Sequence, residues 1–316
     1  MPTRRAVLAG AAAVALGACR PRGRGAVRVG FMTNLTHAPA IVGVASGRFA
    51  ERLGEPVESR SFRSGPRVLE AIVGDAIDIG VSGPAPIVYT HARHPGLLRV
   101  LSGCASGGAS FVVGRDAGIH GPGDLRGKTL ATPQIGTTQD ISLRKFLRAH
   151  GYEPAERGGD VTVHALDAAT ILAQVRLGRL DGAWLPEPWA TRVVMDAGAL
   201  RLIDERELWP ERRFPTAVVI TRNDFARTRG PLVAAFVDAM AAEVERAIAS
   251  PAETRGAARD ELARQIGKAL PAPLVAAAWP FIDFTRDPLP AALETIAEDA
   301  FSLGLAPRAT CKTLFV

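Results

Sequence analysis

A strand, a polar turn rich in glycine or proline, and the start of a helix follow one another repeatedly along this 316-residue chain. The stretch 130–140, Leu-Ala-Thr-Pro-Gln-Ile-Gly-Thr-Thr-Gln-Asp, gives the unit its clearest form. An apolar strand ends, a proline and a glycine turn the chain, and Thr137 or Thr138 caps the next helix, with Asp140 in a capping-box-like position. Strands that alternate with helices predict an α/β fold with mainly parallel sheets flanked by helices.

The same unit recurs elsewhere. Strands are expected over 27–31, 57–62, 77–81, 98–101 and 216–221. Polar turns at 33–38, 64–66, 82–84 and 105–109 lie at the carboxyl ends of the expected strands, where α/β sheets bind ligands. One such turn alone is more often an ordinary helix cap. The set of similar turns favours a binding site on one edge of the sheet.

Two similarly built lobes are indicated by a loose internal repeat. Residues 70–86 and 173–188 each read as a helix, a glycine stop, a short strand with an aspartate, and a Pro-x-Pro turn. Chance convergence of helix–strand units would give the same pattern. The length agrees with two domains, and helices expected at 231–249, 256–269 and 288–303 carry no evident chemistry, so we expect them to serve packing.

The amino terminus predicts export. Arg4 and Arg5 precede a short apolar run that ends in Leu-Gly-Ala-Cys19, so residues 1–18 are predicted to be a signal peptide of twin-arginine character. Leu-Gly-Ala-Cys resembles a lipobox, which predicts a periplasmic or extracytoplasmic protein anchored through a lipidated Cys19. A plain signal peptide with a chance cysteine is the alternative. Residues 19–26 would form a tether.

Several chemistries are disfavoured. The net charge of +6 comes from scattered basic residues without a basic run interleaved with aromatics, so no nucleic-acid partner is expected. Gly127-Lys128-Thr129 lacks the earlier glycine of a P-loop, and 80–84 lacks the last glycine of a hydrolase elbow. Because both motifs are incomplete, we expect no catalytic residues and no cofactor. We also expect no metal, because no metal-ligand spacing relates the six histidines: His37, His91, His94, His120, His150 and His164. Cys104 and Cys311 are expected as buried thiols, with a bridge between them as the alternative.

Six motifs together carry a resemblance: NLTHAP (34–39), SGP (64–66), GDAIDIGVSGPAP (74–86), ASGGAS (105–110), DLRGKTLATPQIGTTQD (124–140) and LDGAWLPEPW (180–189). They are similar to motifs of bacterial ABC-transporter solute-binding proteins of the nitrate/sulfonate/taurine type, a group that includes binders of thiamine-type pyrimidines. The resemblance implies the type II periplasmic-binding-protein fold. Lobe 1 would comprise 27–115 plus 217–316 and lobe 2 would comprise 116–216, with crossovers near 112–117 and 214–218.

The resemblance also implies a binding site between the lobes. One wall would contain Asn34, Thr36, His37, Ser64, Gly65, Ser82, Gly83, Ser106, Gly107 and Gly108. The other would contain Gln134, Thr137, Thr138, Gln139, Glu187 and Trp189. Hydroxyls and amides would hold an oxyanion, and Trp189 would cover an apolar part.

The expected function follows from this resemblance. The chain would be a monomeric receptor, not an enzyme, that binds a small-molecule ligand and docks on an ABC permease with its ATPase. An aliphatic sulfonate is the first expectation. Nitrate, bicarbonate, a thiamine-type pyrimidine and riboflavin are alternatives, as are a sensory domain and an enzyme on the same fold. A zwitterionic ligand is a further alternative, because Asp140 and Glu187 would place negative charge near an anion.

Overall fold

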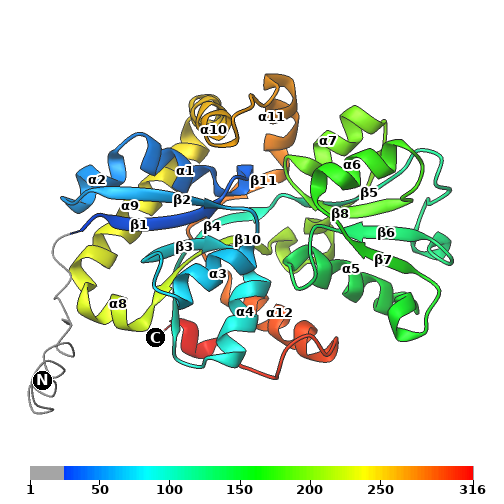
Figure 1. Cartoon of the computed structure of the whole chain (residues 1–316), viewed down its shortest axis with the longest axis horizontal. Helices are drawn as coiled ribbons and strands as arrows, with labels where there is room; N and C mark the ends of the chain where they lie inside the picture. The colour runs from blue at the N-terminus through cyan, green and yellow to red at the C-terminus, as the bar shows by residue number, and fades with distance from the viewer. Residues whose placement is uncertain (1–24, 316) are drawn as a thin grey trace, which may run out of the picture.

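Two lobes lie side by side in the computed structural model, which describes residues 25–315 (Figure 1). The predicted signal peptide and the lipidation of Cys19 therefore lie outside the described residues. Each lobe contains one sheet with helices on both faces, as expected for the α/β class. No helix from residue 25 to residue 315 is both long and apolar enough to cross a membrane.

The sheet of lobe 1 has six strands in the order β11-β4-β10-β3-β1-β2. Their bounds are β1 Val27–Met32, β2 Val57–Phe62, β3 Ile79–Ser82, β4 Leu98–Gly107, β10 Pro215–Arg222 and β11 Ile282–Phe284. Strand β1 pairs in parallel with β2 and β3, whereas β10 is antiparallel to β3 and β4, and β11 is antiparallel to β4. Four of the six strands, β1 to β4, therefore run in one direction, as predicted for a mainly parallel sheet, and β10 and β11 run in the opposite direction.

The sheet of lobe 2 has five strands in the order β7-β6-β8-β5-β9. Their bounds are β5 Ala109–Val113, β6 Thr129–Thr132, β7 Thr162–Ala165, β8 Gly182–Pro186 and β9 Leu200–Asp204. The parallel strands β7, β6 and β8 form one half, and β5 pairs antiparallel with both β8 and β9. Four of the five strands of this sheet therefore run in one direction, and β5 runs in the opposite direction.

Helices cover both faces of each sheet (Figure 1). In lobe 1 these are α1 Ala38–Ala45, α2 Arg48–Leu53, α3 Gly65–Val73, α4 Pro84–Arg93, α8 Asn223–Thr228, α9 Gly230–Ala249, α10 Pro251–Ile266, α11 Ala272–Ala278 and α12 Pro290–Ser302. Lobe 2 has α5 Thr138–Ala149, α6 Ala168–Arg176 and α7 Trp189–Ala197. The helices expected near 231–249, 256–269 and 288–303 are confirmed as α9, α10 and α12.

Each sheet face has its own apolar core. Phe31, Phe49 and Phe236 are fully buried in one cluster of lobe 1, and Ile72 and Ile87 belong to the cluster on the opposite face. Burial of apolar surface contributes roughly 25 cal/mol for each Å² removed from water, so these clusters fix the sheets and the strand ends from which the polar turns begin.

The first passage between the lobes is at Gly107–Gly108, not near 112–117. Strand β4 ends at Gly107 in the sheet of lobe 1, and β5 already belongs to lobe 2. Both glycines have positive φ, 70° and 72°, which lets the chain turn abruptly between two strands. The return passes through two 3-10 helices, η4 Glu205–Leu208 and η5 Pro210–Arg212, before β10 begins. The lobe boundaries therefore lie earlier than 115 and 216.

Candidate functional site

A cleft of about 490 Å³ lies between the lobes and receives residues from both. It is lined by Met32, Thr33, Asn34, Thr36, Phe62, Arg63, Ser64, Gly65, Arg67, Gly83, Pro86, Pro133, Gln134, Thr137, Thr138, Gln139, Asp167, Ala168, Ala169, Pro186, Trp189 and Thr216. Most of these residues follow the carboxyl ends of β1, β2 and β3 in lobe 1 or of β6, β7 and β8 in lobe 2. This is the sheet edge at which the sequence placed the polar turns.

Among the helices that begin at this cleft, α3 and α5 each follow a hydroxyl residue that does not cap the helix. Ser64 precedes α3 and Thr137 precedes α5, and neither side chain bonds to the first turn of its helix. The Thr137 hydroxyl instead donates to the carbonyl oxygen of Gln134 at 2.8 Å. The first N–H groups of a helix have no partner within it, so both starts offer donors and a positive dipole end to a ligand.

The capping box expected around Asp140 does not form. Its carboxylate, fully buried, accepts from Gly136 N at 3.0 Å, from the Thr132 hydroxyl at 3.2 Å and from Arg144 Nε at 3.0 Å. Asp140 therefore holds the turn before α5 in place, and its charge is offset by Arg144, which also pairs with Glu156 at 2.6 Å. The donors at the start of α5 remain available because this carboxylate bonds to the turn instead.

Glu187 is neutralised in the same manner. It is fully buried, and its carboxylate accepts from Arg201 Nη2 at 2.7 Å and from Thr191 N at 3.1 Å. Burial raises the pKa of Glu187, and Arg201 opposes that rise. Its backbone N–H also donates to the Gly108 carbonyl oxygen at 2.8 Å, which ties this residue to the first passage between the lobes.

Ten residues expected in the site line the cleft: Asn34, Thr36, Ser64, Gly65, Gly83, Gln134, Thr137, Thr138, Gln139 and Trp189. Six expected residues are not among its described lining residues: His37, Ser82, Ser106, Gly107, Gly108 and Glu187.

The placement of these six residues has a physical reason in each case. Ser82 Oγ donates to the Gly65 carbonyl oxygen at 3.4 Å, and Ser106 Oγ accepts from Phe214 N at 3.2 Å, so both hydroxyls serve the fold. His37 is fully buried, and burial lowers its pKa to about 3, which keeps the imidazole neutral. Gly107, Gly108 and Glu187 belong to the passage between the lobes.

Arg63 and Asp167 are charged residues of the cleft that the predicted site did not include. Arg63 follows β2, is exposed, and forms no hydrogen bond or ion pair with another described residue. Asp167 accepts from Ala169 N at 3.1 Å and Thr170 N at 3.0 Å and so caps α6. The Thr170 hydroxyl bound to this carboxylate holds the pKa of Asp167 below its usual range. An aspartate directly before an apolar helical stretch is a signal that could have found this cap.

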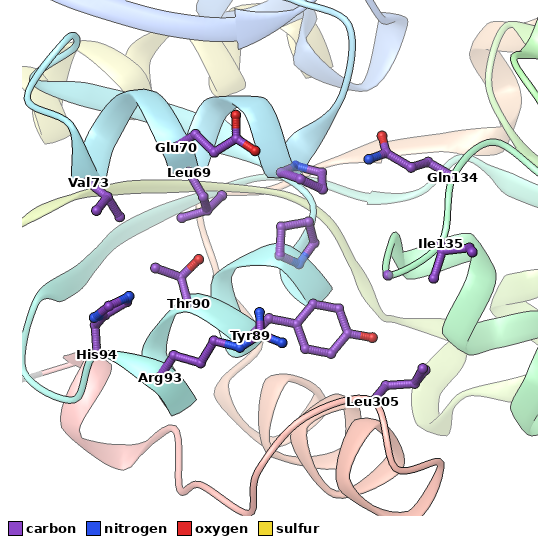
Figure 2. A pocket seen from close by; sticks show the side chains of 13 residues that line it. Leu69, Glu70, Val73, Tyr89, Thr90, Arg93, His94, Gln134, Ile135 and Leu305 are labelled. Atoms are coloured by element: carbon purple, nitrogen blue, oxygen red, sulfur yellow. The ribbon is translucent and has the colours of Figure 1, made fainter.

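A second hollow of about 450 Å³ lies on the other side of the turn 134–136 (Figure 2). Helices α3 and α4 form one side of it, and Ile135 and Leu305 lie opposite (Figure 2). Tyr89 Oη is buried there without a hydrogen-bond partner among the described residues, and burial raises the pKa of the phenol. Gln134 lines both spaces, so the turn that carries it separates this largely apolar hollow from the cleft.

The described part of the chain contains no cluster of three or more histidine, cysteine, aspartate or glutamate side chains that could hold a metal ion. Cys104 and Cys311 are both buried and free, which confirms the expectation of two separate thiols. Within residues 25–315, the cleft therefore offers hydroxyl, amide and guanidinium donors beside apolar side chains. This set suits an oxyanion attached to a small organic group.

This architecture and the cleft at the strand ends are those of a two-lobed solute-binding protein. The chain belongs to the NMT1-like family, whose model matches residues 21–265. It is 29% identical over 227 residues to the taurine-binding periplasmic protein of Escherichia coli K12, which covers 72% of this chain and 68% of that protein. A match to a binding protein of Brucella abortus spans 59% of that protein's length.

Solved structures share the fold over nearly the whole chain. One is the alkanesulfonate-binding protein SsuA of Xanthomonas axonopodis pv. citri bound to MOPS, with a TM-score of 0.73 and 21% identity over 90% of this chain and 96% of that chain. Another is the periplasmic nitrate-binding protein NrtA of Synechocystis PCC 6803, with a TM-score of 0.75 and 18% identity. The match covers 91% of this chain and 84% of that chain. These likenesses confirm the predicted fold class.

Proposed function

We propose that this protein is the extracytoplasmic receptor of an ABC importer and captures a small organic sulfonate between its two lobes. The convergence of the uncapped starts of α3 and α5 on one cleft carries the proposal. These starts come from opposite lobes, so a single oxyanion group that bonds to both would hold the lobes together. A ligand with higher affinity for the closed arrangement drives closure by that difference in affinity.

The organic part of the ligand has a matching surface. Trp189 is half-buried in the cleft, and Met32, Phe62 and Pro186 add apolar contact. A cleft of about 490 Å³ has room for such a group beside the oxyanion. The names of the taurine-binding and alkanesulfonate-binding relatives agree with this chemistry. The closed receptor would deliver the ligand to a membrane permease and its ATPase, and it would act as a binding protein rather than an enzyme.

A thermal-shift screen of the purified protein tests the proposal. The panel holds alkanesulfonates, taurine, nitrate, bicarbonate, thiamine-type pyrimidines and riboflavin. A ligand at about 100 times its dissociation constant adds roughly 2.7 kcal/mol to the free energy of unfolding, which raises the melting temperature measurably. A shift with sulfonates supports the proposal. A shift with heterocycles alone, or with nitrate or bicarbonate alone, would replace the sulfonate with that class.

A further inference from the structure

The described lining of the cleft carries charges of both signs. Arg63, Arg67 and Asp167 are the charged side chains among its described lining residues. Arg67 pairs with Glu70 at 2.7 Å, and Asp167 accepts the first N–H groups of α6. Arg63 is thus the charged group of the cleft lining that neither pairs with a described residue nor caps a helix. The buried carboxylates nearby do not compensate it, because Asp140 and Glu187 already pair with Arg144 and Arg201.

We infer that Arg63 makes this cleft selective for sulfonates whose organic arm is uncharged, so that an amine-bearing sulfonate such as taurine binds more weakly. This inference rests on the proposed function. A sulfonate gains a charge-assisted hydrogen bond from the guanidinium. Among the described lining residues, an ammonium on the arm would meet one carboxylate, Asp167, which already accepts three hydrogen bonds at the start of α6. It would lose water and lie in the same small cleft as Arg63 and two positive helix ends.

The cleft does contain a neutral acceptor for the arm. Asn34 Oδ1 is buried without a hydrogen-bond partner in the part of the chain that the structure describes. Strands β1 and β2 pair in parallel with Met32 opposite Phe62, which places the residues after them, Asn34 and Arg63, at neighbouring strand ends. An acceptor next to a cation suits a neutral hydroxyl donor better than a second cation. A hydroxyl-bearing sulfonate therefore satisfies both groups.

Calorimetric titration with three sulfonates of matched length tests this selectivity: ethanesulfonate, 2-hydroxyethanesulfonate and taurine. We expect 2-hydroxyethanesulfonate to bind most tightly and taurine to bind at least about tenfold more weakly, since tenfold corresponds to one charge-assisted contact of ordinary strength. If taurine binds as tightly as the hydroxyl analogue, the inference is wrong and the proposed receptor function stands. If none of the three binds, the proposed function itself fails.

Variants assign the selectivity to Arg63. Arg63→Gln should weaken binding of 2-hydroxyethanesulfonate about 10- to 100-fold and reduce its advantage over taurine. Arg63→Lys retains the charge, so it should keep part of the affinity for 2-hydroxyethanesulfonate and part of the preference over taurine. Arg60→Gln is the matched control, because Arg60 is an exposed arginine on β2, the strand that precedes Arg63, and lies outside the cleft lining. Unchanged affinity in Arg63→Gln, or an unchanged ratio between the two ligands, would overturn the inference.

Discussion

The substitution Glu205→Gln should remove a pH dependence from the stability of this protein. Glu205 begins η4 and is fully buried. Its carboxylate accepts from Trp184 Nε1 at 2.6 Å and from Ser142 Oγ at 2.5 Å. No cation forms an ion pair with it among the described residues, and Lys145 nearby is paired with Asp299 at 2.7 Å. Burial raises the pKa of Glu205 from its ordinary 4.5 to about 7, because the hydrogen bonds compensate only part of the desolvation.

The sign of the effect follows from proton binding. Folded Glu205 retains its proton at a higher pH than the unfolded chain does. The stability that this group contributes is therefore fully present below pH 4.5 and is lost as the pH rises through about 7. A pKa difference of this size corresponds to roughly 3 kcal/mol of unfolding free energy between the two limits. The neutral amide of the variant cannot ionise, so its stability lacks this term.

Urea unfolding followed by tryptophan fluorescence across the pH range measures the effect. The difference in unfolding free energy between Glu205→Gln and the parent should move in favour of the variant by roughly 3 kcal/mol from acid to alkaline pH. Glu207→Gln is the control, because Glu207 is an exposed glutamate of the same short helix. A difference that stays constant with pH would refute the reasoning, since ionised Glu205 would then carry no penalty in the folded protein.

Three further outcomes are expected. Thr137→Ala combined with Thr138→Ala should weaken ligand binding by about 1–3 kcal/mol while the fold stays intact, and equal affinity in calorimetry would remove the start of α5 from the site. Glu187→Ala should lower the unfolding free energy in urea by about 3–5 kcal/mol because it leaves Arg201, whose side chain is 15% exposed, without its carboxylate partner; a loss below 1 kcal/mol, about the value of an exposed pair, would contradict this. Gly108→Ala should destabilise the fold by about 1–3 kcal/mol more than Gly127→Ala, because both have positive φ but only the former places a Cβ within 2.8 Å of another carbon; equal melting temperatures would argue against crowding at this passage.

Local signals in the sequence were sufficient for the individual strands and helices. The apolar run after residue 27 and the Ser64-Gly65-Pro66 turn predict β1 and the start of α3, because each depends on neighbouring residues alone. The passage at Gly107–Gly108 was not predicted, because Ser102–Ala109 reads as a glycine-rich turn. Its strand character comes from pairing with β10 and β11, more than a hundred residues away in the chain. Strand directions in a mixed sheet depend on such distant partners.

The site was likewise predictable where neighbouring residues determine it and not where distant residues do. Ser64 and Thr137 were predicted from their position before helices, and both line the cleft. The charge balance was not predictable in full, because Glu187 is neutralised by Arg201 on another strand. The pairing of Asp140 with Arg144, four residues later on one helix, was within reach of sequence reasoning.

The position of β10 in the sheet of lobe 1 imposes an order on assembly during synthesis. All five strands of lobe 2 come from the continuous segment 109–204, so a nascent chain possesses them before residue 215 has been made. In lobe 1, β3 and β4 are joined only through β10, and β11 arrives still later to cover the outer edge of β4. Before β10 has been made, β4 has two unpaired edges, and until β11 is made it has one; open strand edges invite pairing with other chains. The lobe that the ribosome starts first is therefore the one that it finishes last.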